Sequence, residues 1–325
     1  MTSEKRIVIV YGNCHTSIIR SYLILCKEFN ESYELHPIEY IQNIKSPSYF
    51  YENTDIRNCD VFIHQSIRKG NRYGEEYSSE NIIKLLKSSC KVISIPNLYQ
   101  LPVCFFPQFV KGNEFKDSYL TVFFRDKIID ELYSKGANWK KIYDVYQDPS
   151  VFDAYDFEEA FNNFIEKVKL RELEWDIKVT DFILENYKKT ILFHDPNHPT
   201  NYLLGYIAIE LLKKLGITNP TINNIQNIQE LDSFEIPAYE STYKNFLVYV
   251  PKRNIYRKTG RKVIRGKMDL KAYIKQYISM EWQNKSLSKY LRIKSFCKYT
   301  CYRVIDFILH VIQKLMKTFF RKKIF

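Results

Sequence analysis

Cys14 has the setting in this sequence that most favours chemistry. It lies within Gly12-Asn13-Cys14-His15, directly after a run of β-branched residues at 7–10 and before a stretch with apolar residues at helical spacing. We expect Gly12 and Asn13 to form the corner, because both take left-handed backbone angles at low cost. The Cys14 sulfur would then face the free N–H groups of a helix N-terminus, which favours a reactive thiol. A buried, inert cysteine is the alternative.

Asp195 and His198 form a second candidate group, after the short apolar segment 190–193. Their spacing lets the carboxylate reach the imidazole and fix the tautomer of a general base. The alternative is a histidine that only caps or packs the helix beginning near Pro199.

Amide and imidazole side chains complete the candidate set. Gln65 and Asn97 follow two further apolar runs and could donate hydrogen bonds to an oxyanion, or could simply bond within their loops. Asn13, His15 and Asn197 adjoin the candidate nucleophile and base, so we include them as candidate substrate-binding residues.

Phosphate-binding glycine loops are absent from the sequence. It has only nine glycines and contains neither Gly-x-x-x-x-Gly-Lys nor Gly-x-Gly-x-x-Gly. A phosphate-bearing cosubstrate would instead need helix N-termini and basic side chains, for which Arg68, Lys69 and Arg125 are candidates. No Cys-x-x-Cys pair occurs, so we expect no zinc ribbon and no metal cofactor.

The elements that must position these residues alternate between strand and helix. Three apolar runs predict parallel strands whose carboxyl ends meet at one sheet edge, where open α/β sheets bind ligands. Helices would cover both faces, and the largely helical region 115–190, with one long amphipathic stretch at 168–187, would be an insertion. The predicted strands are 7–11, 60–65 and 91–95, and the predicted helices include 15–28, 78–86 and 201–215, the last closed by Gly216.

The charge of the chain is unevenly distributed. Of the formal net charge of +12, residues 284–325 carry +10, from eleven Lys or Arg and one Asp. The near-neutral body argues against a nucleic-acid partner and predicts two parts, 1–283 and 284–325. The tail predicts an amphipathic helix on an anionic membrane surface, or one packed on the body, with the apolar face Val304, Ile308, Val311, Ile312, Leu315 and Phe319.

Cysteine usage and the N-terminus indicate a compartment. Seven cysteines at irregular spacing, with no apolar signal region near Met1, are typical of reduced thiols in a cytoplasmic protein. With a basic tail, we expect the protein to be cytoplasmic, on the inner face of the cytoplasmic membrane.

These stretches together resemble the family of capsular polysaccharide biosynthesis enzymes typified by WcbI. The resemblance lies in Gly12-Asn13-Cys14-His15, in 60–65, in Ile95-Pro96-Asn97-Leu98-Tyr99 with Phe106-Pro107-Gln108, and in Asn197-His198-Pro199. It continues more weakly through 236–239 to about 278 and omits the basic tail. His15 departs from the family, which more often has Gln there.

The resemblance implies a three-layer α/β fold like that of SGNH hydrolases, with Cys14 in the place of their serine and His198 in the place of their histidine. It also implies binding of coenzyme A or an acyl-CoA, and transfer of an acyl group, such as acetyl, to a hydroxyl of a capsule or surface-glycan sugar. Two other functions stay open: an esterase or deacetylase with water as acceptor, and a non-catalytic, membrane-docked factor of glycan assembly.

Overall fold

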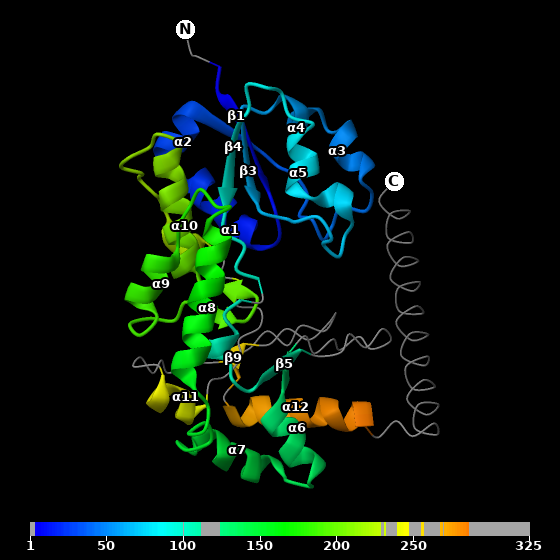
Figure 1. Cartoon of the computed structure of the whole chain (residues 1–325), viewed down its shortest axis with the longest axis vertical. Coiled ribbons are helices and arrows are strands. Elements are labelled where there is room, and N and C mark those ends of the chain that lie inside the picture. Colours follow the sequence, from blue (N-terminus) through cyan, green and yellow to red (C-terminus); the bar gives the residue numbers. More distant parts are fainter. Residues whose placement is uncertain are drawn as a thin grey trace, which may run out of the picture.

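A four-stranded parallel sheet forms the upper part of the computed structural model (Figure 1). The structure describes residues 4–99, 101–111, 124–228, 231, 239–246, 255–256, 267–268 and 270–285. The strand order is β2-β1-β3-β4. The chain leaves β1 in one direction and later returns to its other side, so the topological switch point lies between β1 and β3. These strands are β1 (Arg6–Tyr11), β2 (Tyr33–His36), β3 (Val61–Gln65) and β4 (Lys91–Ile95).

Helices cover both faces of this sheet, as Figure 1 shows. Alternate residues of the strands point to opposite faces, which produces two separate apolar clusters. Val8, Val10 and Ile63 pack toward α1 and α10, whereas Ile9 and Phe62 pack toward α3–α5. The covering helices are α1 (His15–Leu25), α2 (Lys27–Ser32) and α10 (Asn201–Lys214) on one face, and α3 (Ser48–Glu52), α4 (Thr54–Asn58) and α5 (Ser79–Ile83) on the other.

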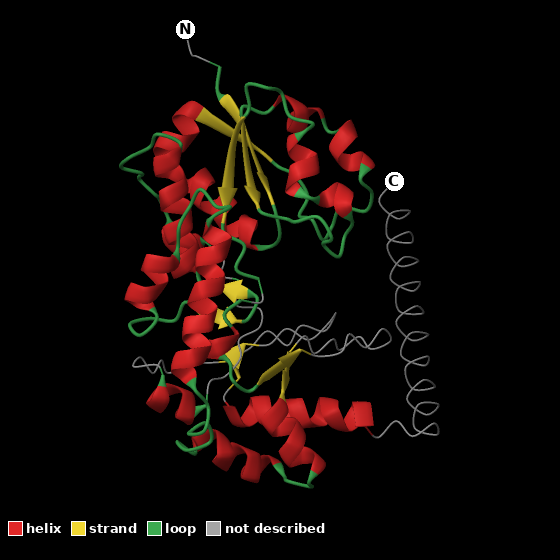
Figure 2. Ribbon diagram, viewed as in Figure 1, coloured by secondary structure: helices red, strands yellow, loops and turns green. Residues whose placement is uncertain are grey.

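A mainly helical lobe lies beyond the carboxyl ends of the strands (Figure 2). Asp126 is fully buried in it and accepts hydrogen bonds from the hydroxyls of Tyr146 and Tyr239, at 2.7 and 3.0 Å. The Tyr277 hydroxyl accepts a bond from the Asp126 backbone N–H, so four segments meet at this residue. The lobe contains α6 (Lys127–Ser134), α7 (Trp139–Gln147), α8 (Phe157–Glu172), α9 (Thr180–Asn186), α11 (Glu240–Asn245) and α12 (Leu270–Lys285).

Short elements connect these parts of the chain. Among them, the hairpin β7–β8 leads directly into α10 and carries both Asp195 and His198. The short strands are β5 (Phe109–Lys111), β6 (Phe124–Asp126), β7 (Phe193–Asp195), β8 (His198–Pro199), β9 (Ile255–Tyr256) and β10 (Lys267–Met268), and the 3₁₀ turns are η1 (Glu75–Tyr77), η2 (Val103–Phe105) and η3 (Ile225–Asn227).

Gly205 allows α1 and α10 to cross closely. A Cβ atom at this position would lie 2.5 Å from the hydroxyl oxygen of Tyr22 on α1. The Tyr22 hydroxyl in turn donates to the Asn201 carbonyl, at 3.3 Å. The close crossing therefore sets the distance between the N-terminal ends of the two helices, where Cys14 and His198 lie.

The predicted α/β class with its parallel sheet is confirmed, and two details were wrong. Gly12 and Asn13 have no left-handed backbone angles. Gly12 is needed for space, because a Cβ there would lie 2.5 Å from the side-chain oxygen of Gln65. The stretch 168–187 is not one helix: it breaks after Glu172, whose carboxylate accepts from the N–H groups of Val179 and Thr180 and caps α9.

Two further sequence predictions had different outcomes. Gly216 has a φ of +93°, which confirms that a left-handed glycine closes the 201–215 helix. The predicted tail, 284–325, lies outside the described residues except for its first two positions.

Candidate active site

Cys14, His198 and Asp195 meet at the switch point of the sheet. Cys14 is the N-cap residue of α1, directly after the β1 corner, and is partly exposed. The Cys14 side chain lies close enough to His198 to interact with it, and His198 Nδ1 lies 2.7 Å from Asp195 Oδ2. Asp195 is fully buried, and its other oxygen accepts from the backbone N–H groups of Asn197 and His198. A thiol, an imidazole and a carboxylate therefore lie in series.

The proton on His198 is held tightly by its neighbours. Burial by itself would lower the pKa of this imidazole, but the Asp195 carboxylate and the Cys14 side chain outweigh it and raise the pKa to about 10. His198 is therefore an imidazolium at neutral pH, with Nδ1 bonded to Asp195 and the other ring nitrogen available to Cys14. A thiol beside a cation is the setting in which a sulfur nucleophile is activated.

His15 links the loops that carry these groups. Its Nε2 donates to the Asn197 carbonyl at 2.6 Å, and its Nδ1 accepts from the Gln65 amide at 3.3 Å. Burial, and secondly the nearby charge of His198, lower the pKa of His15 to about 3. His15 is thus a neutral imidazole with one fixed tautomer, which ties the 195–198 turn to β3.

Gln65 holds the loops together as well. Its oxygen accepts from the Asn13 backbone N–H at 2.8 Å, and its amide donates to the Pro96 carbonyl and to His15. Both amide hydrogens are used, so the prediction that Gln65 donates to an oxyanion does not fit its contacts. The Asn13 side chain accepts from the His15 backbone N–H, at 2.9 Å, and so caps the first turn of α1.

Asn197 has an unused polar atom at this site. Its side chain is buried, and its Oδ1 has no hydrogen-bond partner within the part of the chain that the structure describes. A buried polar atom without a partner costs free energy, so such an atom beside a reactive group is a position for a ligand to bond.

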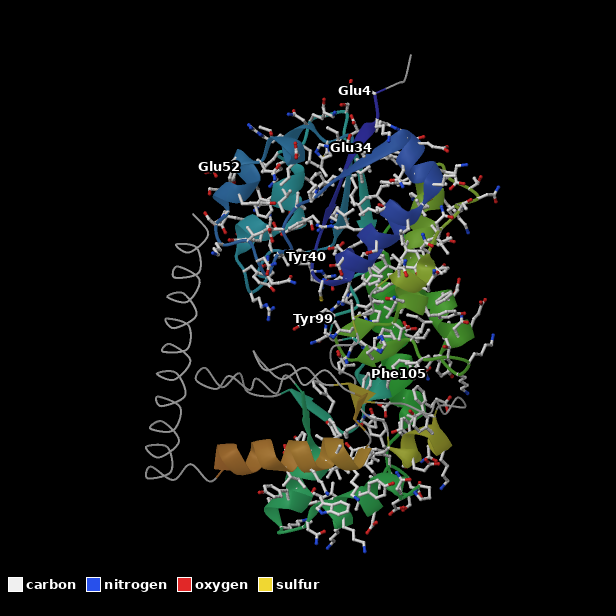
Figure 3. All side chains as sticks on the ribbon, turned by 180° about the vertical axis from the view of Figure 1, so that it is seen from behind. Glu4, Glu34, Tyr40, Glu52, Tyr99 and Phe105 are labelled. Carbon is white, nitrogen blue, oxygen red and sulfur yellow. The ribbon has the colours of Figure 1, made fainter. Side chains whose placement is uncertain are left out.

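A pocket of about 360 Å³ lies beyond the carboxyl ends of β3 and β4. Arg68 and Arg171 both border it, and Arg171 also donates to the Asn97 carbonyl at 3.1 Å. Burial, and secondly the like charge of Arg68, lower the pKa of Arg171, while Glu174 pairs with Arg68 at 2.8 Å. Figure 3 shows Tyr99, another lining residue, just past the strands. The lining is Ser66, Arg68, Asn97, Tyr99, Arg171, Glu174 and Trp175.

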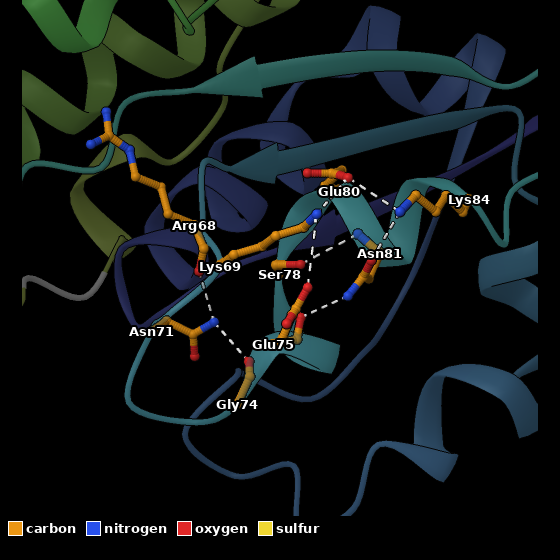
Figure 4. Close-up of polar contacts among 9 residues, drawn as sticks. All are labelled: Arg68, Lys69, Asn71, Gly74, Glu75, Ser78, Glu80, Asn81 and Lys84. Atoms are coloured by element: carbon orange, nitrogen blue, oxygen red, sulfur yellow. Dashed lines mark hydrogen bonds and ion pairs between the residues drawn. The ribbon is translucent and has the colours of Figure 1, made fainter.

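The three basic candidates for phosphate binding have different places. Arg68 borders the pocket. Lys69 extends away from Arg68 and is paired with Glu80 at 2.9 Å and Glu75 at 3.8 Å (Figure 4). Arg125 lies in β6, whose backbone pairs with β5 in the helical lobe. Of the candidates whose side chains the structure describes, Arg68 and not Lys69 lines this pocket.

The segment after α8 contributes to the pocket, which the sequence did not predict. Arg171, Glu174 and Trp175 reach the pocket because Asp176 docks on β4: its carboxylate accepts from the Ser94 backbone N–H at 2.8 Å. The available signal was weak, since Asp176 was one acidic residue in a stretch with helical periodicity.

Among the residues that the structure describes, no group of three or more His, Cys, Asp and Glu side chains is arranged to hold a metal ion. Within the same residues, no helix combines the length and apolar character needed to cross a bilayer.

Known proteins resemble this chain both in sequence family and in fold. A sequence model of the family described as "Polysaccharide biosynthesis enzyme WcbI" matches residues 7–220. A solved structure of WcbI aligns with a TM-score of 0.71 and 21% identity, over 85% of this chain and 89% of that one. That protein is described as native and "without disulfide bond between COA and Cys14". No curated protein matches the sequence. At this identity the solved structure shows a shared fold.

Proposed function

Because the chain belongs to the WcbI family of polysaccharide biosynthesis enzymes, we propose that it transfers an acyl group from a coenzyme A thioester to a sugar hydroxyl. Acetyl is the group we propose, and a capsular or other surface polysaccharide is the product to which the sugar belongs. The proposal rests on one observation, the placement of Cys14, His198 and the hydrogen-bonded Asp195 in series at the switch point of the sheet.

In the first half of the proposed reaction, Cys14 attacks the thioester carbonyl as the thiolate, the counterion of the His198 imidazolium, and forms a new C–S bond. The oxyanion is stabilised by the Cys14 backbone N–H at the start of α1. The carbonyl then re-forms and the bond to the coenzyme A sulfur breaks. His198 gives its proton to that sulfur and becomes neutral, leaving an acyl group on Cys14.

In the second half, neutral His198 acts as the general base. It takes the proton of a sugar hydroxyl while the hydroxyl oxygen attacks the acyl carbon. Collapse of this adduct releases the acylated sugar, returns the sulfur of Cys14 and leaves His198 as an imidazolium beside Asp195. The raised pKa of about 10 suits this cycle, because His198 starts each turnover protonated.

The pocket beyond the carboxyl ends of β3 and β4 supports an anionic cosubstrate. Arg68, Arg171 and Glu174 line the same volume, and because Glu174 pairs with Arg68, one positive charge remains there to attract an anionic group. At about 360 Å³ the pocket suits one part of coenzyme A, such as its diphosphate, with the rest extending outside. The unpaired Asn197 Oδ1 offers a further hydrogen bond, to an N–H or O–H of either substrate.

The remaining expectations from the family resemblance are part of the same proposal. Cys14 follows the first strand and His198 precedes a late helix, which is the order of serine and histidine in SGNH hydrolases. Action on polysaccharide precursors would place the protein at the cytoplasmic face of the membrane.

The test is to incubate the protein with acetyl-CoA and locate acetyl groups by peptide mass spectrometry. We expect acetylation at Cys14, release of free coenzyme A, and loss of both in Cys14→Ala. His198→Ala should slow the release by about 10²–10⁴-fold, the range for loss of a general acid–base. Cys90→Ser, at the opposite end of the sheet, is the matched control and should behave as wild type.

Two results would contradict the proposal. The first is no acetylated Cys14 at millimolar acetyl-CoA in a protein that is folded by circular dichroism. The second is hydrolysis of p-nitrophenyl acetate at a rate that coenzyme A does not affect, with no transfer to sugars, which would favour the esterase.

A further inference from the structure

Cys59 and Cys90 form a close thiol pair away from the candidate active site. Both are free cysteines, and their sulfur atoms lie 3.6 Å apart although they are 31 positions apart in the sequence. Cys59 is buried just before β3, and Cys90 is partly exposed just before β4. These are adjacent parallel strands, and the Lys91 backbone N–H donates to the Asp60 carbonyl at 2.8 Å between them. The backbone thus holds the two thiols side by side.

The surroundings favour a reactive thiol at Cys90. The hydrogen bond that Cys90 shares with Cys59, and also the ammonium of Lys87, lower the pKa of Cys90. Lys87 is held in place by Asp60, at 2.6 Å. The same hydrogen bond raises the pKa of Cys59, so Cys59 keeps its proton and remains the second thiol. One accessible, ionisable sulfur beside one buried resolving sulfur is the usual arrangement of a dithiol that closes on oxidation.

We propose that Cys59 and Cys90 are a redox modification site that closes to an intramolecular disulfide when the protein meets a peroxide. The Cys90 thiolate attacks a peroxide oxygen; a sulfur–oxygen bond forms, the O–O bond breaks, and hydroxide leaves. The Cys59 sulfur then attacks the resulting sulfenic acid at Cys90. The S–S bond forms, the S–O bond breaks, and the oxygen leaves as water with the Cys59 proton. The two thiols lose two electrons, and hydrogen peroxide is reduced to two molecules of water.

The disulfide would join the amino ends of β3 and β4, whereas the candidate active site lies at their carboxyl ends. It closes a loop of about thirty residues that includes β3, α5 and the connection between them, which carries Arg68. Such a cross-link stabilises mainly by restricting the unfolded chain. We therefore expect oxidation to raise thermal stability by on the order of 5 °C.

The test uses the full-length protein, folded and free of ligands. It is treated with hydrogen peroxide, blocked with N-ethylmaleimide before denaturation, and mapped by non-reducing peptide mass spectrometry. We expect a peptide pair linked through Cys59 and Cys90, with Cys26 and Cys104 still free as buried controls. Its appearance should coincide with the rise in Tm, and dithiothreitol should reverse both. Cys90→Ser should show neither change and should fold normally, since Cys90 is partly exposed.

Two results would overturn the proposal. One is that no peptide pair linked through Cys59 and Cys90 forms at peroxide doses that already oxidise Cys14. The other is that Cys90→Ser shows the same reversible rise in Tm as wild type. Neither result bears on acyl transfer, because no step of this test uses coenzyme A or a sugar.

Discussion

At the scale of single residues, the proton on His198 is the feature with the clearest measurable consequence. Its pKa is raised to about 10, from an ordinary value near 6.5, with Asp195 and Cys14 as partners. We predict that NMR titration of wild type places His198 well above the other histidines. Asp195→Asn should return it toward the ordinary range. An unchanged pKa in this variant would show that Asp195 does not hold the proton.

The same shift affects stability. The folded-state pKa of His198 lies above the unfolded value. Its contribution to the free energy of unfolding is therefore complete below about pH 6.5 and is lost as the pH rises through 10. The stability difference between wild type and Asp195→Asn should therefore shrink between these pH values, as chemical denaturation at each pH would show.

His15 lies beside His198, but its pKa is lowered where that of His198 is raised. It is therefore neutral and acts only through its hydrogen bonds. We predict that His15→Ala costs about 1–3 kcal/mol, since the Asn197 carbonyl and the Gln65 amide lose a buried partner. His15→Gln should recover part of this loss, because an amide can also donate and accept. Urea denaturation measures the loss of stability, and the rate of Cys14 alkylation measures whether the bridge positions the site. Equal values in wild type and His15→Ala would show that the bridge does not position the site.

At this scale the sequence indicated which residues meet, but not all of their contacts. The order of strand, Cys14 and helix was readable because β-branched and helical periodicities change abruptly there. The reason for Gly12 was not readable, since it depends on Gln65, more than fifty positions away. Arg171 and Glu174 could not be assigned to the pocket either, because a docked Asp176 redirects the chain after α8.

At the scale of elements, the crossing of α1 and α10 controls how far apart the thiol and the imidazole lie. Gly205→Ala would normally stabilise a helix by about 1 kcal/mol. Here we predict a net loss of about 1–3 kcal/mol, because the new methyl group meets the Tyr22 ring and hydroxyl at 2.5–2.9 Å.

The matched variant is Tyr22→Phe, which removes the closest atom. The double variant should be less destabilised than the sum of the two single changes, by thermal denaturation. Additive effects would show that the two residues do not press on each other.

Asp126 has a comparable role in the helical lobe. Burial is the largest influence on it and raises the pKa of this carboxyl to about 6, against hydrogen bonds from Tyr146 and Tyr239 that lower it. Because the folded-state pKa lies above the unfolded value near 4, this group costs stability increasingly as the pH rises from about 4 to about 6.

We predict that Asp126→Asn removes this slope, so that the variant gains stability relative to wild type between pH 4 and pH 6 in urea titrations. Asp130→Asn, at a less buried carboxyl of α6, is the control. A constant difference between wild type and Asp126→Asn would mean that Asp126 stays ionised across the range.

At the scale of the whole molecule, the charge is concentrated in residues 284–325, which carry +10. Nearly all of this segment lies outside the described residues, so its role stays a prediction from sequence. We predict that the full-length protein floats with anionic liposomes at low salt and is partly released at high salt. Each Lys or Arg at such a surface contributes about 1 kcal/mol, screened by salt.

The variant that tests this prediction replaces Arg321, Lys322 and Lys323 with Gln and should float less. Neutral liposomes are the control and should retain little protein. Equal flotation of wild type and variant, or flotation that salt leaves unchanged, would contradict an electrostatic membrane contact.

The bridge from His15 to Asn197 also has a consequence for the newly made protein, because it spans 182 positions of the chain. A ribosome adding about 5–20 residues per second needs roughly 10–40 s to reach the second partner after the first. During that interval Cys14 lacks His198, and the face of α1 that receives α10 stays uncovered. Contacts of such long range also fold slowly. The nascent chain therefore passes through a period in which its reactive thiol and an apolar surface are exposed together, and chaperone binding to the first half of the chain would protect both.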